Sequence, residues 1–197
     1  MPDIIEQFGK GAIQAPPRFG ATFHLATEPP PVINWSIPYQ IPASLKIRNQ
    51  DGSSSCTAQA TSYYGEALNQ IENNHNENYS ARHIYSQIFM PGGGAYIWKA
   101  MSIPIIQGLA SKNSVPDGLS TELEMVDPSD NYKAVLEAKT DKYAALSRGN
   151  KGIDYLAQVV RDYHGFVTGF NGWNGMFAPD GTVTSWSKVE WGHAVMV

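Results

Sequence analysis

Apolar residues follow a helical period in the stretch that begins at Cys56. They recur at steps of three and four residues, which places them along one side of a helix. The stripe consists of Ala60, Tyr63, Tyr64, Ala67, Leu68 and Ile71. The pattern therefore predicts an amphipathic helix with Cys56 in its first turn. Ser54 and Ser55 come directly before it, and we expect a serine oxygen to accept from the N–H groups of that turn.

Helical periodicity continues until the sequence changes character near residue 164. The further helices expected are residues 81–89, a helix that begins near residue 96, residues 131–138 and residues 152–163. After that point, short β-branched and aromatic runs are separated by glycine and asparagine, as in antiparallel strands. These runs are residues 166–170, 183–186 and 194–197. A mainly helical first half followed by a final sheet indicates the α+β fold class.

Prolines distinguish the first 40 residues from the rest of the chain. Pro16-Pro17 and Pro29-Pro30-Pro31 prevent long helices and favour extended or polyproline conformations. We therefore interpret residues 1–40 as an extended N-terminal arm that precedes the folded unit.

Composition favours a folded chain without a basic surface. Of 197 residues, 42% are hydrophobic and 16% are charged, and the formal net charge is −4. Such a charge balance cannot collect phosphates, so nucleic acid is excluded as a general partner. No apolar run reaches the roughly 18 residues of a membrane span, and no signal peptide is recognised. We therefore expect no membrane partner, and a cytoplasmic or virion-associated location.

Cys56 is the single cysteine, so it cannot form an intramolecular disulfide. A thiol becomes a good nucleophile when a helix N-terminus or a neighbouring imidazolium lowers its pKa. Among five histidines, His193 alone follows a glycine and opens an apolar strand, a rigid position from which a ring can be aimed. Cys56 and His193 are thus the candidate nucleophile and base. One cysteine and scattered histidines offer no ligand pair at zinc spacing, so we expect no metal site.

The residues around Cys56 and His193 resemble the active site of papain-like cysteine peptidases, particularly the bacterial and viral branches. Gln50 lies six residues before Cys56, a serine turn fills the interval, and Thr57 follows the cysteine. His193 lies 137 residues after Cys56, and the interval typical of this family is about 130–150 residues. In addition, the run Gly93-Gly94-Ala95 is similar to the turn that lines the substrate groove of the family.

The resemblance implies a papain-like two-lobe fold that forms one catalytic unit. Residues 41–125 would be the helical lobe with the nucleophile, and residues 126–197 the β-rich lobe with the histidine. In the family, an asparagine that orients the histidine lies on later strands, whereas this chain ends four residues after His193. We therefore expect the β-rich lobe to be incomplete, and no residue is assigned to the orienting role.

The resemblance also implies the catalytic roles. Cys56 would attack the peptide bond, His193 would pair with the thiolate and protonate the leaving amine, and Gln50 would donate to the oxyanion. The run of residues 93–95 would bind an extended peptide or protein substrate by main-chain pairing. Such acyl-enzyme chemistry needs no cofactor.

The leading hypothesis is a cysteine peptidase that cleaves peptide bonds through a thioester acyl-enzyme. A first alternative is a catalytically silent relative that binds protein in the groove, for example a virion structural component, and the missing asparagine strand favours it. A second alternative is an acyl transferase or peptide ligase, in which an amine resolves the thioester in place of water. The sequence does not separate the two acyl fates.

Overall fold

Helices and a two-stranded ribbon make up the computed structural model, which describes residues 12–13, 34–36, 38–40, 42–50, 52–140, 146, 152–173, 175–180, 182–185 and 189–197. The helices are α2 (Cys56–Asn73), α3 (Ala81–Ile88), α4 (Ile97–Ile106), α5 (Glu122–Met125) and α6 (Gly152–Tyr163), with a 3₁₀ turn η1 (Asn131–Lys133). The strands are β1 (Ala12–Ile13), β2 (Ala95–Tyr96), β3 (Leu109–Ala110), β4 (Leu136–Glu137), β5 (Val167–Gly172) and β6 (Trp191–Met196).

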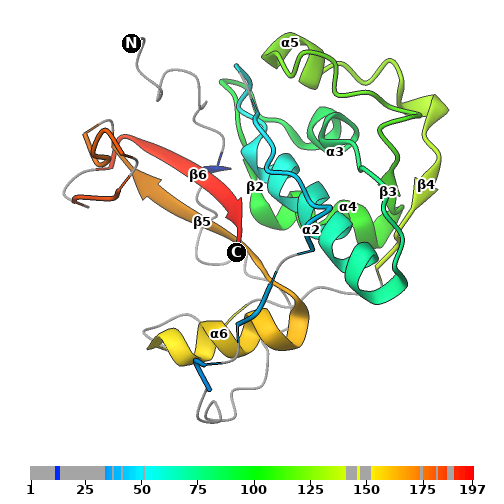
Figure 1. Ribbon diagram of the computed structural model, residues 1–197. Coiled ribbons are helices and arrows are strands. Elements are labelled where there is room, and N and C mark those ends of the chain that lie inside the picture. The colour runs from blue at the N-terminus through cyan, green and yellow to red at the C-terminus, as the bar shows by residue number, and fades with distance from the viewer. Residues whose placement is uncertain are drawn as a thin grey trace.

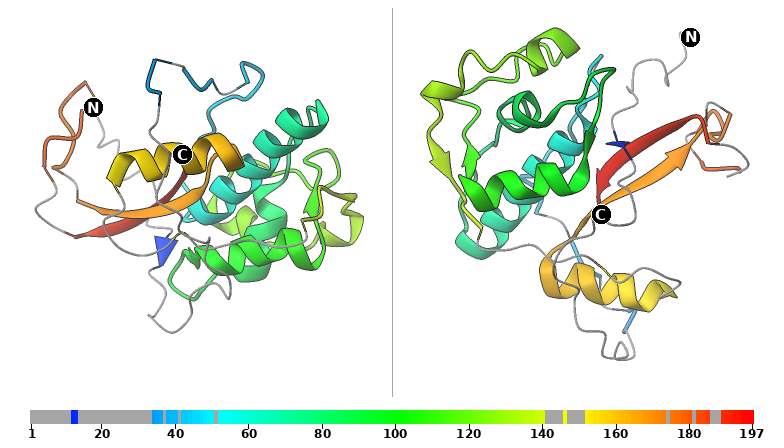
Figure 2. Two further views of the ribbon diagram at one scale, coloured as in Figure 1. Left: turned by 90° about the horizontal axis from the view of Figure 1, so that it is seen from below. Right: turned by 180° about the vertical axis from the view of Figure 1, so that it is seen from behind.

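Helix α2 lies between helices α3, α4 and α5 and the antiparallel ribbon that β5 and β6 form (Figure 1). Helices α3, α4 and α5 gather on one side of the molecule, and β5 and β6 lie on the other (Figure 1). Contacts of α2 with α3, α4 and β6 join the two sides. Helix α6 lies beyond one end of the ribbon, as Figure 1 and the right panel of Figure 2 show. The mixture of helix and sheet confirms the predicted α+β class. None of the helices in the described ranges is both long and apolar enough for a membrane span.

Two hydrophobic clusters hold these elements together. The larger one surrounds α3 and consists of Ala58, Tyr79, Ala81, Ile84, Tyr85, Ile88, Ala95, Ala100, Ile103, Leu109 and Met125. The smaller one joins Cys56 and Ala60 of α2 to Ala194 of β6. Removing this apolar surface from water stabilises the docking of the ribbon on the helix that starts at Cys56.

Three short pairs of strands complete the architecture. Strands β5 and β6 pair antiparallel over six residues each, in a register that puts Phe170 opposite His193. Strands β3 and β4 also pair antiparallel. Strands β1 and β2 pair in parallel, with Ala12 opposite Ala95. The N-terminal segment is therefore tied to the strand that follows the glycine-rich turn.

Most of the predicted elements are present, but two predictions are wrong. The segment 131–138 is not a helix, because it forms η1 and then β4, which pairs with β3. Ala138 also has a φ of 43°, in the left-handed region that no right-handed helix contains. In the segment 183–186, the described residues form only an isolated bridge between Val183 and Phe177. The predicted arm of residues 1–40 lies largely outside the described residues.

A buried ion pair anchors the segment that leads to α2. Arg48 donates to the carboxylate of Glu66 and, at 2.9 Å, to the carbonyl oxygen of Tyr79. The same carboxylate accepts from the N–H of Tyr79 at 2.6 Å. Burial raises the pKa of Glu66, and the positive charge of Arg48 is the largest influence that opposes this rise. The pair therefore fixes the chain to α2 only two residues before Gln50.

Replacing Arg48 with Met should lower the free energy of unfolding by about 3 kcal/mol near neutral pH, because Glu66 would keep a buried charge without its partner. Loss of Arg48 should raise the folded-state pKa of Glu66 further above its unfolded value of about 4.5. The loss of stability in Arg48→Met should therefore be small below about pH 4.5, where Glu66 is protonated. It should grow as the pH rises through the folded-state pKa of Glu66. Urea denaturation at acidic and neutral pH measures both effects.

The exposed Lys46 lies on the same segment, so Lys46→Met serves as the charge-matched control, with an expected change below about 1 kcal/mol. An Arg48→Met penalty that does not depend on pH would contradict the ion-pair explanation.

Candidate active site

Cys56 lies where α2 meets β6. It is the first residue of the helix, and its side chain is 1% exposed. The Sγ atom accepts a hydrogen bond from the backbone N–H of Ala194 at 3.3 Å. Ala194 directly follows His193 in β6, so the docking of the ribbon brings the candidate nucleophile to the peptide unit that carries the candidate base.

His193 is the third residue of β6, so the strand begins two residues earlier than the sequence predicted. Its ring makes an edge-to-face contact with Phe170 of β5, and the two ring centroids lie 5.6 Å apart. Burial lowers the pKa of His193. The neutral imidazole is therefore favoured unless a negative charge forms close to the ring.

Gln50 is buried in a tight turn with the serines that precede Cys56. Its Nε2 donates to the carbonyl oxygen of Ser53 at 2.9 Å. In return, the carbonyl oxygen of Gln50 accepts from the N–H of Ser53 at 3.2 Å and from its hydroxyl at 2.9 Å. The first of these bonds holds the side-chain amide of Gln50 beside the start of α2, and the other two close the turn at the Gln50 carbonyl group.

Ser55 occupies the N-cap position of α2, as predicted, but its side chain makes no capping hydrogen bond. Its hydroxyl instead shares a hydrogen bond with the hydroxyl of Ser53, at 2.7 Å. The serines therefore stabilise the turn and do not neutralise the positive end of the helix by capping.

The glycine-rich turn lies against the serine turn. Gly92, Gly93 and Gly94 have φ values of 92°, 91° and 82°, a region that residues with a Cβ rarely adopt. A Cβ on Gly93 would come within 2.9 Å of the Ser54 hydroxyl oxygen. Ala95 follows as the first residue of β2. The structure thus brings the predicted substrate-binding residues next to the turn that carries Gln50.

An extended segment of the chain itself pairs with β2. Strand β1 lies parallel to it and contacts β6 as well (Figure 1). Ala12 packs against the cluster that contains Cys56, and its carbonyl oxygen approaches Gly192 so closely that a Cβ there would collide with it. The main chain of β2 therefore pairs with an extended strand that packs close to Cys56.

The sequence did not reveal Glu122 and Tyr85, which also make polar contacts in this region. One carboxylate oxygen of Glu122 accepts from the N–H of Ser54 at 2.5 Å, and the other accepts from the hydroxyl of Tyr85 at 2.8 Å. Glu122 lies 68 residues from Ser54 and belongs to no recognisable motif. Only the packing of α5 on α3 brings it to the site.

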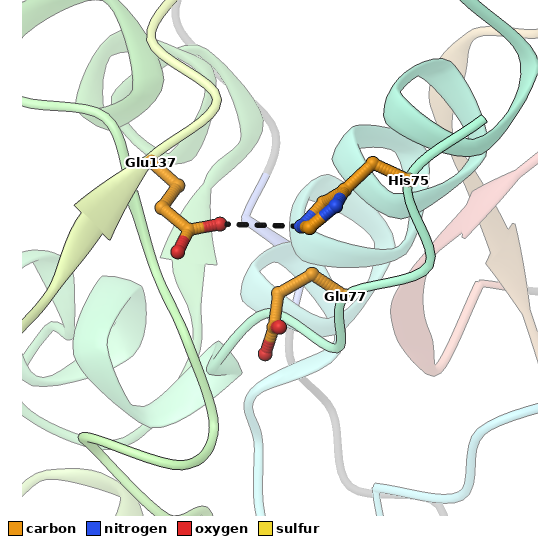
Figure 3. A group of neighbouring side chains, drawn as sticks. All are labelled: His75, Glu77 and Glu137. Carbon is orange, nitrogen blue, oxygen red and sulfur yellow. Dashed lines mark ion pairs between the residues drawn. The ribbon is translucent and has the colours of Figure 1, made fainter. Parts of the chain in front are cut away.

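A separate group of possible metal ligands lies near the other end of α2. The donor atoms of His75, Glu77 and Glu137 all lie within 4.8 Å of one another (Figure 3). His75 and Glu137 approach to 3.7 Å, an ion pair when the histidine is protonated, and the Ser111 hydroxyl donates to Glu77 at 2.6 Å. Sequence analysis could not find this group, because only the pairing of β4 with β3 brings Glu137 to the loop after α2. Its contacts tie that loop to the β3–β4 pair, far along the helix from Cys56.

Solved structures that are similar to this chain at low sequence identity include the following three. Xylellain, a cysteine protease from Xylella fastidiosa, is 20% identical, with a TM-score of 0.64 over 97% of this chain and 79% of its own. ProCathepsin B S9 from Trypanosoma congolense is 17% identical, with a TM-score of 0.60 over 79% and 56%. A structure from work on antibody cross-reactivity between the mite allergens Blo t 1 and Der p 1 is 21% identical, with a TM-score of 0.53 over 87% and 59%.

The chain thus spans little more than half the length of two of these proteins and about four fifths of xylellain. No protein-family model matches the sequence, and no curated protein matches it. The structural similarity, together with the mixed helix and sheet, shows that the chain has the fold of the papain-like cysteine peptidases.

Proposed function

We propose that this chain is a cysteine peptidase that cleaves peptide bonds through a thioester acyl-enzyme. The observation that carries the proposal is the 3.3 Å hydrogen bond from the N–H of Ala194 to Sγ of Cys56, because it seats the thiol beside the His193 segment at a helix N-terminus. The fold supports the proposal, since the similar proteins include a cysteine protease and a procathepsin.

The surroundings of Cys56 act on its thiolate in opposite directions. The N-terminus of α2 and the N–H of Ala194 both favour a negative sulfur, whereas burial disfavours it. Burial likewise favours the neutral form of His193. Neither charge is favourable alone, so we expect the thiolate and the imidazolium to form together and to titrate as a coupled pair.

In the proposed reaction, the sulfur of Cys56 bonds to the carbonyl carbon of the peptide, and the carbonyl electrons move to the oxygen. His193 gives its proton to the amine as the C–N bond breaks, which leaves a thioester. His193 then takes a proton from water, the hydroxide adds to the thioester, and the C–S bond breaks. The carboxylic acid leaves and the thiol is regenerated.

The oxyanion formed in both steps needs hydrogen-bond donors. We assign this role to the side-chain amide of Gln50 and the backbone N–H of Cys56, each of which can lower the barrier by about 3 kcal/mol. The hydrogen bond from the Gln50 amide to the Ser53 carbonyl oxygen supports the assignment, because it fixes the amide before substrate arrives. A donor that is already oriented does not have to be reorganised during the reaction.

The substrate would be an extended peptide that pairs with the main chain at residues 93–95. The pairing of β1 with β2 supports this mode of binding, because it shows an extended segment of this chain held by the same strand. Main-chain pairing makes few demands on the side chains of the bound peptide.

Cys56→Ala should abolish peptide hydrolysis without unfolding the protein, because it removes only the sulfur atom that would attack the peptide. An assay of peptide hydrolysis measures this loss.

His193→Ala should shift the labelling of Cys56 by iodoacetamide to higher pH, toward the ordinary thiol pKa of about 8.5, because no imidazolium would stabilise the thiolate. Mass spectrometry of the alkylated protein across a pH series measures this shift. His75→Ala, at the far end of α2, is the matched control and should leave the profile unchanged.

Retained turnover in Cys56→Ala would remove the nucleophile assignment. A labelling profile that His193→Ala does not move would show that the two side chains do not interact. Turnover that appears only with an added amine would instead favour the acyl transferase.

Gln50→Ala should lower kcat by about a hundredfold while the rate of Cys56 labelling changes little, because the lost donor acts on the transition state. Ser53→Ala is the control: it keeps the Gln50 amide and the Ser53 carbonyl, so its effect on kcat should be below about tenfold. Steady-state kinetics and labelling of the three proteins give the comparison. If labelling of Gln50→Ala falls as steeply as turnover, Gln50 is structural.

A further inference from the structure

A continuous line of hydrogen bonds joins the turn before Cys56 to the glycine-rich turn. It runs from the N–H of Ser54 to the carboxylate of Glu122, then to the hydroxyl of Tyr85, whose oxygen accepts from the N–H of Gly94 at 2.8 Å. Its four members come from the serine turn, α5, α3 and the glycine turn. Glu122 is the one charged group in this line, and both of its oxygens are engaged.

The protonation of Tyr85 gives the line a fixed direction. Tyr85 is fully buried, and burial followed by the hydrogen bond to Glu122 raises the pKa of its hydroxyl. It therefore stays protonated, donates to the carboxylate and accepts from Gly94. Hydrogen bonds to a carboxylate are roughly twice as strong as those between neutral groups, so Glu122 is the strongest link of the line.

No covalent cross-link is available to hold the serine turn and the glycine turn together. Cys56 is the single cysteine of the sequence, so no disulfide within the chain can join them. The glycine turn also has an unusual main-chain conformation, with three successive φ values in the left-handed region. Its position against Ser54 must therefore be fixed by non-covalent contacts.

We propose that Glu122 is a positioning residue that sets the glycine turn against the turn carrying the nucleophile. This inference rests on the proposed peptidase function, because that function makes residues 93–95 the site of the peptide and Cys56 the attacking group. Without Glu122, a peptide held by the glycine turn would be displaced from the sulfur, while the sulfur itself would keep its contact with Ala194.

If Glu122 positions the glycine turn, its loss should affect iodoacetamide and a peptide substrate to different extents. Iodoacetamide needs only the thiol, so its reaction with Cys56 should change less than about twofold in Glu122→Ala. A peptide substrate must be aligned by the glycine turn, so kcat/KM should fall by at least about tenfold, since small misalignments cost large factors in rate.

Amide hydrogen exchange tests the link without relying on activity. In Glu122→Ala the Gly94 amide should exchange at least about tenfold faster than in the native protein, although the N–H of Gly94 donates to Tyr85 and not to Glu122. Glu122→Gln should give a smaller increase, because one amide oxygen can replace only one of the two carboxylate acceptors. This conservative variant also keeps the test informative if Glu122→Ala does not fold.

Glu124→Gln is the matched control, because it makes the same chemical change in the same helix. The carboxylate of Glu124 accepts from the hydroxyl of Thr121 and from the N–H of Leu119, both within five residues along the chain. Its replacement should leave the exchange of Gly94 and the ratio of peptide to iodoacetamide reactivity unchanged.

The outcomes separate the positioning role from the proposed function. Unchanged Gly94 exchange in a folded Glu122→Ala protein would overturn the link. Equal losses of iodoacetamide and peptide reactivity would overturn the positioning role, because Glu122 would then act on Cys56 itself. If the native protein hydrolyses no peptide but Glu122→Ala accelerates Gly94 exchange, the link holds and the peptidase proposal fails.

Discussion

The contact between β6 and the start of α2 is the constraint on which the candidate site depends. Cys56 and Ala194 are 138 residues apart, yet they share a hydrogen bond and a small apolar cluster. In an antiparallel pair, alternate residues direct their N–H groups away from the partner strand, and the N–H of Ala194 donates to a sulfur atom. The candidate nucleophile is therefore also a structural acceptor for the strand that carries His193. Any change that loosens the ribbon will disturb both residues together.

Two carboxylates organise the chain that leads to Cys56. Glu66 accepts from Arg48 and from the N–H of Tyr79, and Glu122 accepts from the N–H of Ser54 and from Tyr85. In each case one acidic side chain satisfies a backbone donor and a side-chain donor from separate segments. Buried polar groups of this kind specify a unique arrangement, because any alternative packing leaves one of them unsatisfied. Hydrogen bonds to these two carboxylates therefore order the segment before Cys56, in addition to the apolar packing of the helices.

The sequence predicted those features that depend on local patterns. The stripe after Cys56 predicted α2, and the spacing of Gln50, Cys56 and His193 indicated a papain-like fold that the structural similarities confirm. The catalytic roles of these residues remain predictions. Features that depend on tertiary pairing were missed: β4 replaced a predicted helix because β3 lies beside it, and Glu122 enters the site through the packing of α5. Periodicity along one segment contains no information about such distant partners.

The pairing of β1 with β2 has a thermodynamic consequence for any ligand of that strand. A peptide that adds to β2 at Ala95 in the place of β1 competes with a segment of the same polypeptide, whose effective concentration does not fall on dilution. The apparent dissociation constant of the peptide then equals its intrinsic value divided by the fraction of molecules in which β1 has left. If β1 left in about one molecule in a hundred, a peptide of micromolar intrinsic affinity would appear to bind a hundredfold more weakly. Affinity measured on this chain thus reports the opening of its own N-terminal segment as much as the fit of the peptide.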